Sequence, residues 1–184
     1  MSKELLESSK AYLKPALFKK ACPLTPYWDN FIHHFDYQFN NSNYPHKVTV
    51  GSQTSMINGT LLKERFYVSA FQATDKFYPQ LNYATSLLEN WYGDTHDNAF
   101  ALMNFVGNEA PVQVHMDRRD SFYWQCIGSS IWEIFDSADS ASPTESHTLT
   151  PGDVIFVPEG MYHRIVTPEA RAAISICFNS KTKF

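Results

Sequence analysis

Residues 149–166 read LTPGDVIFVPEGMYHRIV, and this stretch carries the pattern of turns and strands that decides the fold. A Pro-Gly-Asp turn leads into the apolar run VIFV, and Pro158 and Gly160 form a second tight turn before another run of strand-forming residues. A hairpin of this shape returns His163 over the face of a sheet. The stretch therefore predicts antiparallel β structure with a histidine held beside a turn.

A second stretch, QVHMDRR at residues 113–119, places His115 and Asp117 one residue apart. In an extended strand the side chains at i and i+2 point to the same face, so this spacing aims an imidazole and a carboxylate at one spot. Two imidazoles and one carboxylate, with further coordination positions open, form the facial triad of non-haem Fe(II) oxygenases. We therefore expect His115, Asp117 and His163 to bind a metal ion and to act in catalysis.

The rest of the chain predicts helices first and strands afterwards. Helical spacing of apolar residues predicts a short helix before Pro15, a helix over 25–40 with Thr25 as its N-cap, and a helix over 75–93. Short β-like runs separated by turn-forming residues lie at 47–51, 64–72, 98–107, 110–117, 121–128, 130–136, 152–158, 162–167 and 171–178, with a polar loop at 141–148. This order predicts a mainly β protein, an antiparallel barrel or sandwich wrapped by N-terminal helices. We expect residues 1–60 to form the helical extension and first strand, and residues 61–184 to form one compact barrel domain.

The composition of the 184-residue chain narrows the function classes. Its formal net charge is −4 and its basic residues are scattered, so nucleic-acid binding is not implied. Its cysteines, Cys22, Cys126 and Cys177, lack the spacing of a metal site or a redox motif, which favours reduced thiols and a cytoplasmic location. We expect no membrane partner, because no apolar stretch has the length of a membrane span and the N-terminus has no leader pattern.

Two segments together resemble the metal-binding motifs of the cupin-like, JmjC-related oxygenases. Residues 115–135, HMDRRDSFYWQCIGSSIWEIF, resemble the first motif, and residues 149–166 resemble the second, with its turn, strand, Pro-x-Gly and distal histidine. The residues that follow His-x-Asp at similar spacings are Phe122, Gln125, Gly128 and Trp132. The resemblance implies a double-stranded β-helix, Fe(II), 2-oxoglutarate as co-substrate, and reaction with O₂ that hydroxylates or demethylates a protein side chain or a small molecule. It also favours a homodimer.

The sequence departs from that family at one position. Relatives carry Lys or Arg two residues before the Trp of the first motif, and this chain has Ser130 there. Other branches of the 2-oxoglutarate oxygenases take their carboxylate-binding arginine from the strand that follows the distal histidine, which here contains Arg171. By this resemblance Arg171 is the expected substitute, with Ala173 in place of the serine that usually follows it. A surface arginine paired with Glu169 or Asp153 is the alternative interpretation of Arg171.

Two strand residues complete the expected co-substrate site. Asn104 and Tyr123 belong to strands that border the predicted cavity, where either side chain is able to hydrogen-bond a keto-acid carboxylate. The sequence as a whole favours an Fe(II)- and 2-oxoglutarate-dependent dioxygenase. Two alternatives stay open: a metal cupin that does not use 2-oxoglutarate, such as an isomerase, lyase or dioxygenase, and a non-catalytic binding or structural module with the cupin fold.

Overall fold

The computed structural model describes residues 3–40, 49–50, 53–54, 65–69, 79–105, 107 and 113–179. Its helices are α1 (Lys3–Ala11), α2 (Trp28–Asn40) and α4 (Pro79–Tyr92). Its strands are β1 (Ala16–Phe18), β2 (Thr49–Val50), β3 (Gln53–Thr54), β4 (Arg65–Ser69), β5 (Asn98–Asn104), β6 (Asp120–Ile127), β7 (Ser130–Phe135), β8 (Glu145–Leu149), β9 (Val154–Val157), β10 (Tyr162–Val166) and β11 (Arg171–Phe178). Within this part of the chain, no helix combines the length and the apolar character needed to cross a membrane.

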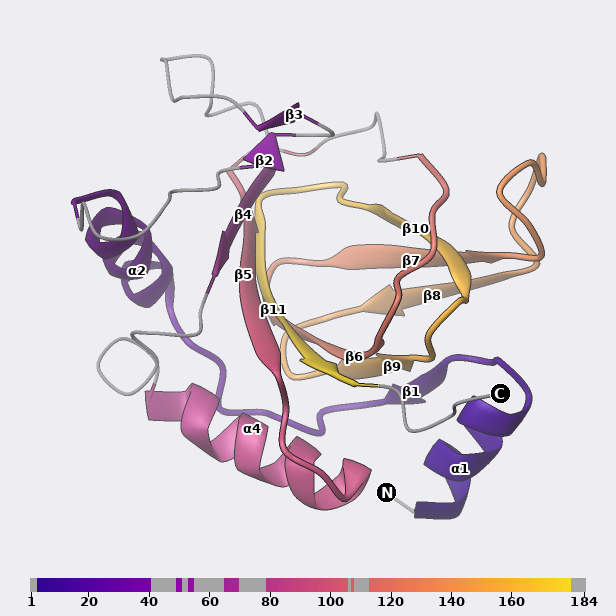
Figure 1. Cartoon of the computed structure of the whole chain (residues 1–184). Helices are drawn as coiled ribbons and strands as arrows, with labels where there is room; N and C mark the ends of the chain where they lie inside the picture. Colours follow the sequence, from indigo (N-terminus) through magenta and orange to yellow (C-terminus); the bar gives the residue numbers. More distant parts are fainter. Residues whose placement is uncertain are drawn as a thin grey trace.

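Two antiparallel sheets form the barrel. One has six strands in the order β1-β9-β6-β11-β5-β4, and the other has three in the order β10-β7-β8. Figure 1 shows the helices on the outer side of the six-stranded sheet, while the three-stranded sheet lies across the barrel from β5 and β11. This is the double-stranded β-helix of the cupins with N-terminal helices packed on it, so the predicted fold class is confirmed.

Strands β5, β6, β9 and β11 of the larger sheet are buried on both faces, which explains their nearly continuous apolar sequence. In β6, Tyr123 points between the two sheets, whereas Trp124 packs under the helices. The inner cluster comprises Leu102, Tyr123, Trp132, Ile134, Leu149, Ile155, Val157, Met161 and Ala173. The outer cluster joins Leu6 of α1, Phe31 of α2 and Leu81 and Leu88 of α4 to the other face of the sheet. The six-stranded sheet is therefore the shared wall of two cores, and only the inner one borders the candidate site.

Three local predictions need correction. The polar loop expected at 141–148 contains most of β8, because a strand with one solvent face tolerates polar residues while Leu149 alone is buried. The prediction missed strand β1, which lies just after Pro15 in the N-terminal extension and pairs with β9. Helix α2 begins at Trp28 and not at Pro26, since the Asn30 side chain accepts a hydrogen bond from the Tyr27 amide at 2.9 Å and caps the helix there.

The expected strand over 110–117 is also wrong for its described part, 113–117. There the chain makes one isolated bridge, between His115 and His163, and no regular strand. Parts of other predicted elements lie outside the described residues, including 47–48, 70–72, 75–78 and 110–112.

Candidate metal centre

His163 is positioned by the turn between β9 and β10. Gly160 has φ +81°, a left-handed conformation that favours glycine, and the Met161 amide donates to the Pro158 carbonyl at 3.3 Å. The chain then enters β10, where His163 pairs with Ile134 of β7. The imidazole is buried inside the barrel mouth, as the hairpin in the sequence predicted.

The segment that carries His115 and Asp117 is fixed to β10 by backbone hydrogen bonds. The amides of His115 and His163 each donate to the carbonyl of the other, at 3.0 and 2.8 Å. The Gly160 amide donates to the Asp117 carbonyl at 2.9 Å. The two side chains therefore face His163 because this irregular segment is anchored to β10, and not because it forms a regular strand.

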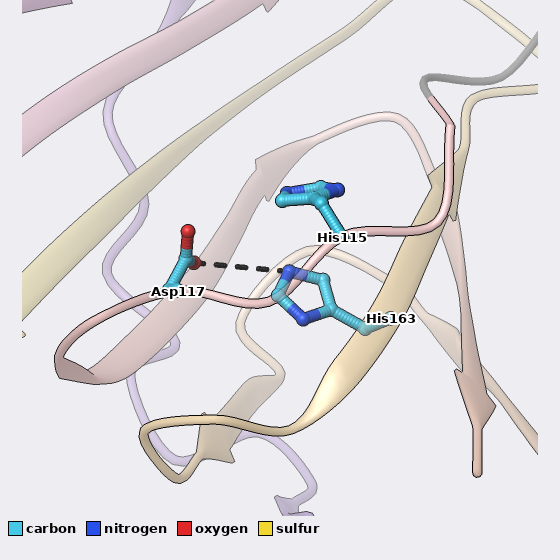
Figure 2. Close-up of side chains that lie close together, drawn as sticks. All are labelled: His115, Asp117 and His163. Carbon is cyan, nitrogen blue, oxygen red and sulfur yellow. Dashed lines mark ion pairs between the residues drawn. The ribbon is translucent and has the colours of Figure 1, made fainter. Parts of the chain in front are cut away.

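The three side chains converge on one point. A ligand atom from each of His115, Asp117 and His163 lies within 4.8 Å of the others. Figure 2 shows the carboxylate and the His163 ring facing each other, with His163 Nε2 and Asp117 Oδ2 3.8 Å apart. The His163 side chain is 2% exposed and that of Asp117 is 49% exposed, so the site opens to solvent on the carboxylate side.

Backbone carbonyls determine which ring nitrogen carries the proton in both imidazoles. His163 Nδ1 lies 2.9 Å from the Met161 carbonyl oxygen, and His115 Nδ1 lies 3.0 Å from that of Gln113. A carbonyl can only accept, so each Nδ1 carries the proton and each Nε2 keeps its lone pair for a metal. Two such nitrogens and one carboxylate oxygen are the donor set of the facial triad, and the residues therefore fit Fe(II).

Burial lowers the pKa of His163, and the nearby His115 lowers it further, against the opposing effects of the Met161 carbonyl and Asp117. A lowered pKa keeps the ring neutral at neutral pH, which is the form that binds a metal. Trp132 stacks on the ring with centroids 4.9 Å apart and an interplanar angle of 25°. This contact fixes the plane of the imidazole from inside the barrel.

A polar layer lies in the barrel interior beyond Trp132. We use this name for five polar side chains that are each no more than 1% exposed: Asn104, Gln125, Ser130, Thr167 and Arg171. A row of ring contacts joins the layer to the candidate metal site. The Arg171 guanidinium carbon lies 5.9 Å from the Tyr123 ring centroid, Tyr123 packs on Trp132 at 4.9 Å, and Trp132 stacks on His163.

Arg171 is the only charged member of the polar layer. Its Nη1 donates to the Leu102 carbonyl at 3.2 Å, and its Nε meets no hydrogen-bond partner among the described residues. The alternative of a surface arginine is wrong, because Arg171 is 1% exposed. The carboxylates proposed for that pairing are engaged elsewhere: Glu169 accepts from Ser129 at 2.6 Å, and Asp153 accepts from Lys19 at 2.9 Å.

Ser130 occupies the position where family members carry a basic residue, and its hydroxyl is already used. It donates to Gln125 Oε1 at 2.7 Å, while Gln125 Nε2 donates to the carbonyls of Ile127 and Gly128 at 2.8 and 3.2 Å. Gly128 has φ +64°, and a Cβ there would collide with the Ala170 carbonyl oxygen and lie 3.2 Å from the Arg171 Cα. The absence of a side chain at Gly128 thus lets the backbone that carries Arg171 approach β6.

Asn104 and Tyr123, the other residues predicted for the co-substrate site, are both buried in the structure. Asn104 is buried opposite Arg171 and donates through Nδ2 to the Glu169 carbonyl at 3.0 Å. Tyr123 is buried between the sheets, within the row of ring contacts. Sequence reasoning missed Thr167, a buried member of the layer. Its position four residues after His163 was the available signal, because residues i and i+4 share one face of a strand.

Comparisons with known proteins identify the family and the fold of the chain. The JmjC domain profile matches residues 77–183, more than half of the chain, and the chain therefore belongs to the JmjC domain family. This confirms the predicted resemblance to cupin-like, JmjC-related oxygenases. A search by sequence finds no match among curated proteins.

Solved structures resemble the chain in fold. A crystal structure of the Escherichia coli ribosomal oxygenase YcfD superposes with a TM-score of 0.63 at 16% identity, over 92% of this chain and 49% of that one. A second structure of E. coli YcfD gives 0.66 at 15% identity, over 98% and 53%. A third, in complex with cobalt and 2-oxoglutarate, gives 0.60 at 17% identity, over 92% and 49%. The chain thus spans about half the length of these neighbours, and at such identities the likeness establishes the fold.

Proposed function

We propose that the chain is an oxygenase that uses Fe(II) and 2-oxoglutarate, of the hydroxylase or demethylase type. The observation that carries the proposal is the buried guanidinium of Arg171, which pairs with no carboxylate among the described residues. A buried cation without an anion is costly, so this interior suits an anionic ligand. A keto diacid has a group for each partner, because its keto-acid end can occupy open metal positions and its distal carboxylate can pair with the guanidinium.

In this proposal His115 and His163 bind the iron through Nε2, and Asp117 binds it through a carboxylate oxygen. Iron at this position supplies the oxidation in which one oxygen atom of O₂ enters the substrate and the other enters succinate, formed from 2-oxoglutarate with loss of CO₂. The remaining residues orient the metal ligands and surround the co-substrate. The backbone hydrogen bonds and Trp132 fix the imidazole planes, and Arg171 with Asn104 and Tyr123 line the path of the co-substrate.

The comparisons support the same proposal. The chain belongs to the JmjC family, and YcfD structures exist with cobalt and 2-oxoglutarate and with cobalt and succinic acid. YcfD is described as a ribosomal oxygenase, which favours a protein side chain over a small molecule as the substrate class here. A second candidate function is a metal cupin that does not use 2-oxoglutarate. Ser130 favours that candidate, since it removes the family's usual carboxylate-binding charge.

The experiment is to incubate the protein in air with Fe(II) and 2-oxoglutarate and to quantify succinate by mass spectrometry. The wild-type protein should form succinate in a reaction that needs both iron and O₂. His163→Ala should form none, whereas His33→Ala is a matched control, because His33 is exposed on helix α2, outside the barrel. A wild-type protein that binds Mn(II) but neither binds 2-oxoglutarate nor forms succinate would favour the metal cupin instead.

A further inference from the structure

The hydroxyl of Thr167 lies buried in the polar layer. Thr167 is 0% exposed, and its Oγ1 has no hydrogen-bond partner among the described residues. Leaving a buried hydroxyl without a hydrogen bond costs free energy, so such a group calls for an explanation. Ser130, Gln125 and Asn104 differ from Thr167, because each of them donates to a protein acceptor.

The register of β10 turns Thr167 toward the barrel interior. His163 and Thr167 are four residues apart, so their side chains share one face of the strand at a separation of about 13 Å, from a rise of ~3.3 Å per residue. Val166 pairs with Ile131 of β7, and continuing that register by one residue sets Thr167 opposite Ser130. The Thr167 hydroxyl therefore lies farther into the barrel than the metal ligands, in the layer that contains Arg171.

Thr167 and Arg171 lie at the two ends of the short connection between β10 and β11. It is held from two sides, because a Cβ on Gly107 would collide with the Pro168 carbonyl and a Cβ on Gly128 would collide with that of Ala170. The Asn104 side chain adds a hydrogen bond to the Glu169 carbonyl. The connection between Thr167 and Arg171 is therefore packed closely against its neighbours in the chain.

We infer that Thr167 is a specificity-determining residue, whose hydroxyl donates a hydrogen bond to the same distal carboxylate that Arg171 binds. This inference rests on the proposed function. A carboxylate has two oxygens and accepts several hydrogen bonds, so a guanidinium and a hydroxyl can bind it together. Ala173, on the inner face of β11, offers no hydroxyl to the layer, and Ser130 donates its own to Gln125. Thr167 supplies the donor that neither of them provides.

The test is the affinity of Mn(II)-loaded protein for two keto acids, measured anaerobically by calorimetry. Thr167→Val keeps the shape of the side chain and should weaken 2-oxoglutarate roughly tenfold, whereas Thr167→Ser should stay near the wild type. Pyruvate has the keto-acid end but no distal carboxylate, so its affinity should be the same in the wild type and in Thr167→Val. Mn(II) affinity should not change. Thr85→Val is the matched control, because that hydroxyl donates to the Leu81 carbonyl of its own helix.

The outcomes separate the inference from the proposed function. Thr167→Val that binds 2-oxoglutarate as tightly as the wild type would overturn the role of Thr167 and leave the oxygenase proposal standing. Equal weakening of pyruvate and 2-oxoglutarate would also overturn it, because the hydroxyl would then act on the fold of the site. A wild-type protein that binds Mn(II) and pyruvate but gains nothing from the distal carboxylate of 2-oxoglutarate would contradict the proposed function itself.

Discussion

Replacing Arg171 by methionine should weaken 2-oxoglutarate binding and at the same time stabilise the ligand-free protein. The guanidinium is 1% exposed, so its attraction to a bound carboxylate is little screened by solvent. Truncating one partner of a buried charge pair costs about 2–5 kcal/mol, and a loss near the middle of that range weakens binding by roughly two to three orders of magnitude. Without the ligand, the same side chain is a buried charge whose hydrogen bonding to the described residues is limited to the Leu102 carbonyl. Methionine removes that unfavourable charge and keeps most of the apolar volume, so the melting temperature should rise by a few degrees.

The assay is titration of 2-oxoglutarate into the anaerobic Fe(II) protein, followed by the metal-to-ligand absorbance, together with thermal unfolding of the ligand-free form. Arg171→Lys should bind with intermediate affinity, since an ammonium lacks the planar fork of donors. Arg164→Met is the matched control, because Arg164 is partly exposed and pairs with Glu133 at 2.6 Å. Unchanged affinity in Arg171→Met would refute the clamp and redirect the search to Arg118 and Arg119, two exposed arginines that directly follow Asp117 in the sequence. A large fall in the melting temperature would show that Arg171 serves the fold.

Three further predictions follow from the same structure. Alanine at any one of the three candidate metal ligands should abolish Mn(II) binding, measured by calorimetry, while circular dichroism shows a folded barrel. Undiminished affinity for Mn(II) in one of these variants would remove that residue from the site. Burial raises the pKa of Asp153, but hydrogen bonds from Thr150, Lys20 and Lys19 outweigh this effect and hold it below its usual value. Asp153→Asn should therefore lower the free energy of unfolding in urea by about 1–3 kcal/mol at neutral pH. This difference from the wild type should vanish as the pH falls from about 4 through the lower pKa of the folded state, where Asp153 becomes protonated. A difference that stays constant with pH would argue against ionisation of Asp153 as the cause. Gly128→Ala should destabilise the fold by about 1–3 kcal/mol because of its positive φ and the collision with Ala170, and wild-type stability in that variant would contradict the described turn.

Much of the fold could be predicted because its signals are local. The turn at Pro158 and Gly160, the apolar runs of β6 and β9 and the helical spacing before residue 93 all depend on neighbours in the sequence. Strand β8 could not be predicted, because its polar residues face solvent and its pairing with β7 is a long-range contact. The predicted division at residues 60 and 61 stays a prediction.

The candidate site could likewise be predicted only where its signals are local in the sequence. The spacing of His115 and Asp117 predicted that they act together, yet the cause is the bridge to His163, which no local pattern reveals. Local sequence also does not predict the burial of Arg171. Its neighbours in the sequence include Glu169, which suggested a surface ion pair, whereas the pairing of β11 with β5 and β6 turns the guanidinium inward.

The most direct test of the central claim is a crystal structure of the protein grown anaerobically with Mn(II) and 2-oxoglutarate. The account predicts Mn(II) bound by His115, Asp117 and His163, the keto acid on the metal, and the distal carboxylate within hydrogen-bond distance of Arg171. A metal ion bound elsewhere, or a 2-oxoglutarate whose distal carboxylate points away from Arg171 toward solvent, would contradict it.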